Sequence, residues 1–316
     1  MTIVEKRRAD ELLDKIKWSI ESKDFNNAST LHNQLYDGVI DTCHNRGEYT
    51  ITIPYLETLA DLSSHVAIRA LTLFYGESES DVTLDYVVEK FKLYSQNGNK
   101  PGNYLAMLKL GEIYIGGRGK GTDLVKKFKD ELHKYENIEE GAELINRAMD
   151  AIDESIGLIA KDIDAAREGA CTKRELGIFC SLGIAYTKAA GLYRQLLNKL
   201  NIVDTIETIE KQSNYIDKET ICYEKFLEWE SKYGYLINSE IREDLRHMAE
   251  ENIEPSKEQL RKIELSLRKM TDPSNKMAMQ VDETSVECPY CGKIHYRKVH
   301  CRASYCNECK RVFNTY

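Results

Sequence analysis

Hydrophobic positions in the first part of the chain recur with the spacing of amphipathic helices. Residues 9–36 carry two such sets on either side of Lys23 and Asp24, namely Leu12, Leu13, Ile16 and Ile20, then Phe25, Ala28, Leu31 and Leu35. Apolar residues three and four apart share one face of a helix, so two antiparallel helices with a short turn are predicted here. Residues 49–53 alternate and are β-branched, which predicts an extended segment before a helix that begins at Pro54.

Longer helical patterns follow in the second half of the chain. Residues 139–167 and 172–200 predict two long helices that form a hairpin, and residues 218–233 and 239–251 predict two more. After Pro255, Ser256 and Gln259 have the spacing of a capping box, so a separate last helix is expected to end near Met270. Residues 271–286 lose this periodicity and predict a linker.

A short pattern of small, apolar and aromatic residues recurs within these helices. It centres on Leu71, Leu110 and Leu182, which stand 39 and 72 residues apart. A recurrence of about 36 residues is the length of one helix–turn–helix unit in a solenoid. The pattern therefore favours a stack of antiparallel helix pairs. An irregular helical bundle with one fortuitous motif is the alternative.

The middle copy of the pattern is the most complete. Gly111 is predicted to make room where two helices cross, and Gly117 and Gly119 to end the first helix, because glycine adopts positive φ without strain. Thr122 then offers an N-cap for a second helix over residues 123–135.

This copy resembles a Sel1-like repeat, a subclass of the tetratricopeptide superfamily. The residues that match the family pattern in register are Ala106, Leu110, Gly111, Tyr114, Gly117, Gly119 and Asp123. The family places an alanine four residues after the aspartate, whereas this chain has Lys127 there. The resemblance covers about one repeat well and about half the chain weakly. It implies a right-handed stack of helix pairs whose concave surface binds other proteins.

The C-terminal residues carry the one motif with clear chemistry. Two Cys-x-x-Cys pairs, fourteen residues apart, have the pattern of a zinc ribbon: Cys288, Cys291, Cys306 and Cys309. Four thiolates form a closed tetrahedral shell around one structural Zn²⁺. Strands are expected over residues 294–299 and 311–314. The predicted organisation is a helical-repeat scaffold over residues 1–270, a linker over 271–286 and a β zinc ribbon over 287–316.

Other metal chemistry fits this pattern less well. A catalytic zinc needs an open coordination position, a redox dithiol needs a βαβ context that is absent, and an iron–sulfur cluster is less usual at this spacing. His295, His300 and Cys301 lie between the pairs and are alternative ligands, although two complete pairs already satisfy the metal. The cysteines outside the tail are predicted to be small core residues, namely Cys43, Cys171, Cys180 and Cys222.

The amino-acid composition is that of a globular protein. Hydrophobic residues make up 42% and charged residues 30%, as in an ordinary globular protein, and no apolar run is long enough for a membrane helix or a signal peptide. A cytoplasmic location without membrane contact is therefore expected. The 19 tyrosines suit thin helical layers, because each ring packs while its hydroxyl stays near water.

Charge is distributed unevenly along the chain. Residues 286–316 hold six basic and two acidic residues, a net of +4, and since the whole chain carries −8, residues 1–285 carry −12. A basic tail on an acidic body indicates an anionic partner for the tail. If that partner is nucleic acid, Tyr296 and Tyr305 could stack on bases, and the residues predicted to contact phosphates are Lys293, Arg297, Lys298, Arg302, Lys310 and Arg311.

No Walker loop, dinucleotide fingerprint, zinc-protease motif or nucleophile elbow is found in the sequence. The leading prediction is therefore a non-enzymatic scaffold or adaptor for a protein partner, with the zinc ribbon as a second docking module. The alternative is a regulator that binds nucleic acid through the basic ribbon. An enzyme with scattered catalytic residues is a third, more distant hypothesis.

Overall fold

The computed structural model describes residues 1–62, 64–77, 80–96, 103–116, 123–165, 173–200 and 206–271, and short strands between residues 279 and 314. This part is mostly helical, which confirms the mostly α character that the sequence predicted. The N-terminal helices are α1 (Ile3–Glu21), α2 (Phe25–Leu35), α3 (Asp41–His44), α4 (Tyr49–Asp61), α5 (His65–Phe74), α6 (Leu84–Gln96), α7 (Asn103–Tyr114) and α8 (Asp123–Lys127). The long helices are α9 (Ile138–Ala165), α10 (Lys173–Lys199), α11 (Ile206–Tyr233) and α12 (Ser239–Thr271). Short π- and 3₁₀-helical turns are η1 (Tyr36–Ile40), η2 (Leu132–Tyr135) and η3 (Gly234–Leu236).

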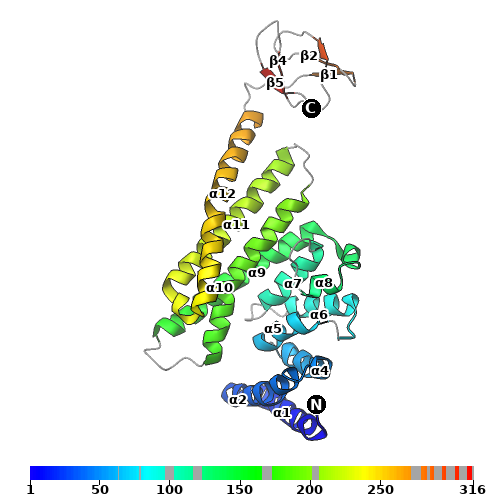
Figure 1. Ribbon diagram of the computed structural model, residues 1–316, viewed down its shortest axis with the longest axis vertical. Coiled ribbons are helices and arrows are strands. Elements are labelled where there is room, and N and C mark those ends of the chain that lie inside the picture. The colour runs from blue at the N-terminus through cyan, green and yellow to red at the C-terminus, as the bar shows by residue number, and fades with distance from the viewer. Residues whose placement is uncertain are drawn as a thin grey trace.

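Helices that are close in sequence pack together. α1 packs on α2, α4 on α5, α6 on α7, and each of α9, α10 and α11 on the next long helix, while α7 also packs along α9. Figure 1 shows an elongated molecule with α1, α2 and α4 at the bottom and with α6, α7 and α8 beside the long helices. One continuous hydrophobic core runs from Ala9 in α1 to Ala249 in α12. Among the described residues, no helix has both the length and the apolar character needed to cross a bilayer.

The turn between α1 and α2 lies where the sequence predicted it. Lys23 has φ 61°, the left-handed conformation that reverses the chain after α1. The side chain of Asp24 then accepts a hydrogen bond from the backbone N–H of Asn27 and caps α2. The predicted antiparallel hairpin is thus confirmed.

The prediction around Pro54 was wrong. Residues 49–53 are not extended but form the start of α4, and Pro54 lies inside this helix. Proline removes one helical hydrogen bond. Burial outweighs that loss, because Ile53, Leu56 and Leu59 place one apolar face of α4 in the core at 0–6% exposure. Tertiary packing therefore decides the helix start here, whereas local sequence preference does not.

α7 and α9 cross closely at two glycines. A Cβ on Gly111 would lie 3.3 Å from the carbonyl oxygen of Gly141, and a Cβ on Gly141 would lie equally close to that of Gly111. Gly111 thus makes room for a helix crossing, as predicted, but its partner is α9. The predicted second helix over residues 123–135 is wrong, since only α8 and η2 form there. After α7, Gly116 has φ 71°, and the predicted helix-ending residues Gly117 and Gly119 and the cap Thr122 lie outside the described residues.

Lys127, at the position where the Sel1-like pattern has an alanine, contacts the segment that follows α5. Its ammonium donates to the backbone carbonyls of Tyr75, Glu77 and Ser80, at 3.3, 2.9 and 2.6 Å. Burial against this segment lowers the pKa of Lys127. Nearby, a Cβ on Gly76 would lie 2.5 Å from the backbone nitrogen of Leu124, so the segment after α5 and the start of α8 touch through their backbones. A lysine at position 127 therefore anchors the segment that follows α5, which an alanine cannot do.

Replacing Lys127 by methionine is expected to lower the free energy of unfolding by about 1–3 kcal/mol, because the carbonyls that it serves lose a charged donor. Chemical denaturation measures this change. Lys126→Met is the matched control, since the Lys126 side chain is 66% exposed and pairs only with Asp123 among the described residues. An equal loss in both variants would contradict the anchoring role of Lys127.

α12 is one unbroken helix and not the two that were predicted. Pro255 lies inside it, and Ser256 does not cap a new helix because its hydroxyl, in a buried residue, accepts a hydrogen bond from Arg194 Nη2 at 3.0 Å. Arg194 also pairs with the buried Glu219 of α11 at 2.9 Å. At the start of α12, Arg242 and Arg246 both bind the carboxylate of Glu230, which is 1% exposed. The Glu230 contacts fasten the start of α12 to α11, and Arg194 of α10 joins the middle of α12 to α10 while it also pairs with α11.

Tyrosine hydroxyls join neighbouring helical segments. Several donate to carboxylates of another element at 2.7–2.8 Å, namely Tyr55 to Asp10, Tyr75 to Glu57, Tyr135 to Asp85 and Tyr186 to Asp153. Burial and the adjacent carboxylate raise the pKa of Tyr55 to about 12, so its hydroxyl stays a donor at neutral pH. The rings pack in the core while the hydroxyls satisfy carboxylates near its edge.

The C-terminal residues form short antiparallel strands, drawn beyond the end of α12 in Figure 1. These are β1 (Met279–Asp282), β2 (Ser285–Glu287), β3 (Ile294–Tyr296), β4 (Ala303–Tyr305) and β5 (Val312–Asn314). β1, β2 and β3 form one sheet in that order, and β4 pairs with β5. β3 and β5 lie within the predicted strands 294–299 and 311–314, whereas β1 and the start of β2 lie in the segment predicted as a linker.

Candidate functional site

Each Cys-x-x-Cys pair lies between two strands that pair with each other. Glu287 of β2 is the register partner of Ile294 of β3, so residues 288–293 connect the two strands of an antiparallel hairpin. Tyr305 of β4 is likewise the partner of Val312 of β5, and residues 306–311 connect that hairpin. The two connections have the same length, and in both the first cysteine directly follows a strand.

The predicted ligands and basic residues themselves lie outside the described residues. These are the ligands Cys288, Cys291, Cys306 and Cys309 and the basic side chains of Lys293, Arg297, Lys298, Arg302, Lys310 and Arg311. Of the alternative ligands, His295 is in β3, while His300 and Cys301 are also outside. The chemistry of the donor set fits a metal, because two thiol pairs in connections of equal length would supply the four sulfurs that a structural zinc takes. Within the described part, no group of three or more His, Cys, Asp and Glu could hold a metal ion.

The described cysteines of the helical body, Cys43, Cys180 and Cys222, do not resemble nucleophiles or metal ligands. Cys43 and Cys222 are buried, as predicted, and burial raises the pKa of both thiols, that of Cys222 to about 12. Cys180 is half-buried, and its thiol donates to the carbonyl of Leu236 at 3.4 Å. Cys171 lies outside the described residues. A high thiol pKa leaves almost no reactive thiolate at neutral pH.

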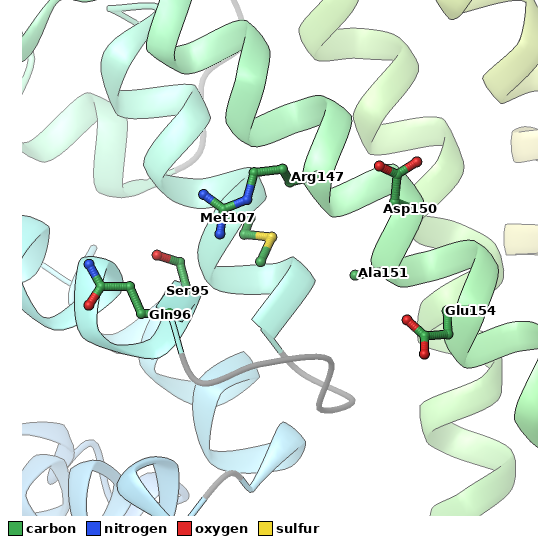
Figure 2. Close-up of a pocket in the computed structure, with 7 residues that line it drawn as sticks. All are labelled: Ser95, Gln96, Met107, Arg147, Asp150, Ala151 and Glu154. Atoms are coloured by element: carbon green, nitrogen blue, oxygen red, sulfur yellow. The ribbon is translucent and has the colours of Figure 1, made fainter.

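A cavity of about 240 Å³ opens between α6, α7 and α9. It is lined by Ser95, Gln96, Met107, Arg147, Asp150, Ala151 and Glu154. Figure 2 shows the charged residues on α9, with the side chain of Arg147 reaching toward α7 and the carboxylates of Asp150 and Glu154 on the α9 side. The lining residues that the structure describes include neither a cysteine nor a histidine, and the Ser95 hydroxyl already donates to the carbonyl of Lys92 at 2.8 Å. Its side chains could hold a polar group but do not form a nucleophile–base pair.

A second polar cluster joins α5, α7 and α10, and sequence reasoning did not find it. Arg69 of α5 donates to the hydroxyl of Ser181 of α10 at 3.0 Å. On α7, Lys109 pairs with the buried Glu112 at 2.9 Å. Lys188 of α10 interacts electrostatically with all three charged groups. The cluster thus brings three cations and one carboxylate together from helices that are far apart in the sequence.

Lys188 is the residue of this cluster whose charged form is disfavoured by its surroundings. Its side chain is exposed to solvent, yet the surrounding protein lowers its pKa, and Lys109 and Arg69 lower it further. Among the described residues, no hydrogen bond or ion pair engages its ammonium. Helical spacing places Lys188 on one face of α10 with Ser181. Gly177 and Gly191 lie on the same face, and a Cβ on either would meet nothing within 4 Å, so this face is open.

Comparison with known proteins assigns no function to the cysteine pairs, to the cavity or to the polar cluster. The chain matches no protein-family model, no curated protein and no solved structure. A function for this protein must therefore be argued from its own residues and contacts.

Proposed function

We propose that this chain is a non-enzymatic adaptor with two docking modules. The helical body would act as a repeat-like scaffold for a protein partner, and residues 287–316 would form a zinc ribbon around one structural Zn²⁺. The observation that carries this proposal is the position of both Cys-x-x-Cys pairs in six-residue connections between paired strands. That arrangement supports two knuckles facing one metal ion, with Cys288, Cys291, Cys306 and Cys309 as its ligands.

The packing of the body supports the scaffold half of the proposal. Several consecutive helices pack as pairs, and the core is continuous from α1 to α12, as expected for an array of helix pairs. Arrays of this kind present extended surfaces rather than a single deep active site. The charged lining of the cavity between α6, α7 and α9 is consistent with contacts to a polar partner.

The adaptor proposal predicts that partners divide between the two modules. Affinity capture would compare the full-length protein with Cys288→Ser/Cys291→Ser, which removes half of the zinc ligands. We expect the variant to lose one group of partners and to keep another, since the helical body is unchanged. Quantitative mass spectrometry measures both groups. Loss of all partners, or of none, would show a single docking surface and contradict the adaptor.

A nucleic-acid regulator is the second candidate, favoured by the charge asymmetry between the +4 tail and the −12 body. In this function the six basic residues of the tail would contact phosphates. The adaptor predicts instead little binding, because the acidic body repels the phosphate backbone.

Anisotropy with labelled single-stranded and duplex DNA and RNA, over about 50–300 mM salt, distinguishes the two functions. The comparison variant has all six basic residues replaced by glutamine. Tight binding that falls steeply with salt and is absent in the variant would favour the nucleic-acid regulator over the adaptor. Equal, weak binding by both proteins supports the adaptor.

A further inference from the structure

We propose that Arg69, Lys109 and Lys188 form a binding site for an oxyanion, a phosphate or carboxylate group of a ligand. The site lies on the helical body between α5, α7 and α10, and it stands independently of the zinc ribbon. It goes beyond the adaptor proposal because it assigns a chemical class of ligand to one location on the body.

The charge balance of the cluster is the first reason. Among the described residues, Lys188 lies within electrostatic reach of two further cations, Arg69 and Lys109, and of one carboxylate, that of Glu112. The body as a whole is strongly acidic. Glu112 neutralises only one of the three cations and already pairs with Lys109. Like charges in a partly desolvated place repel one another, and an anion that binds between them relieves this repulsion. The ligand that fits the cluster is therefore negatively charged.

The available donors are the second reason. An ammonium has three N–H donors and a guanidinium has five. Lys109 uses one on Glu112, Arg69 uses one on Ser181, and within the described part Lys188 uses none. The remaining donors match the several acceptor oxygens of a phosphate or a carboxylate. Ser181, which accepts from Arg69, fixes the guanidinium of Arg69 beside α10.

Accessibility is the third reason. Lys188 is exposed, and Lys109 keeps 15% of its side chain accessible beside it. The open space at Gly177 and Gly191 extends along the same face of α10. A ligand can therefore approach Lys188 from solvent without displacing a core residue.

Isothermal titration calorimetry on the full-length, zinc-loaded protein tests the site at constant ionic strength. The probes are inorganic phosphate, a phosphoserine peptide and a glutamate-rich peptide without phosphate. At least one probe is expected to bind, and Lys188→Gln is expected to weaken that binding about tenfold or more, as for loss of a charge-assisted contact. The probe that binds best identifies phosphate or carboxylate as the group recognised.

Two further variants keep the test decisive. Glu112→Gln removes the one carboxylate and is expected to tighten binding, which a purely structural role of the cluster does not predict. Lys17→Gln removes the same charge from an exposed position on α1 and is expected to leave binding unchanged. The proposal is overturned if no probe binds the unmodified protein, if Lys188→Gln binds as tightly as that protein, or if Lys17→Gln weakens binding equally.

Discussion

Replacing Cys288 and Cys291 by serine is expected to abolish binding of one zinc ion per chain and to unfold the C-terminal strands, while the helices stay folded. The strands are three or four residues long, too short to bury enough apolar surface for independent stability. Metal binding of about 10–16 kcal/mol would supply the missing free energy. Metal analysis measures the loss of zinc, and circular dichroism at the helical band is expected to change little.

The matched control for this experiment is Cys301→Ser. Cys301 lies between the two pairs in the sequence, so its replacement removes a thiol of the same tail without touching either pair. We expect one zinc ion per chain to remain bound. Loss of zinc in Cys301→Ser, or full zinc occupancy in Cys288→Ser/Cys291→Ser, would refute the proposed ligand set. Chelation of the metal is expected to reproduce the effect of the double variant.

Gly183→Ala is expected to destabilise the helical body by about 1–3 kcal/mol or more, the typical effect of overpacking a core. A Cβ at this position would lie 2.4 Å from Cδ2 of Trp229, where real contacts do not occur. The indole cannot move aside easily, since Trp229 is 4% exposed and packs against Phe179, Phe226 and Tyr233. Helices α10 and α11 would therefore have to separate.

The same helix offers the control for Gly183→Ala. Gly191 also lies inside α10, but a Cβ there meets nothing within 4 Å. Gly191→Ala is expected to stabilise the protein by about 0.5–1 kcal/mol, because alanine favours the helix and costs less chain entropy than glycine. Denaturant unfolding of both variants gives the comparison. Similar free energies of unfolding would mean that α10 and α11 do not approach this closely.

The sequence predicted helices where local signals and packing agree. The turn at Lys23 and Asp24 was predictable because a break in apolar spacing coincides there with an N-cap. Pro54 and Ser256 misled the prediction because local signals for a helix start were outweighed by distant contacts. For Pro54 that contact is core burial of α4, and for Ser256 it is the hydrogen bond from Arg194 of α10. No local pattern carries such information.

The two candidate sites also differ in how much of each could be predicted from local sequence. The four cysteines can be proposed as ligands from the sequence alone because metal ligands in a ribbon come from short, local motifs, and this ligand set stays a prediction. Arg69, Lys109 and Lys188 carry no motif and are ordinary solvent-exposed charges in a single sequence. Only the packing of α5, α7 and α10 brings them together, and a sequence pattern that places residues on one helix face cannot say which other face lies opposite.

The continuity of α12 has a mechanical consequence. The helix is held at its N-terminal end by Arg242 and Arg246 on Glu230 and at its middle by Arg194 on Ser256, and it runs on without a break to Thr271. Because α12 is continuous from these contacts to Thr271, a displacement of its C-terminal end would tilt the whole helix against α10 and α11.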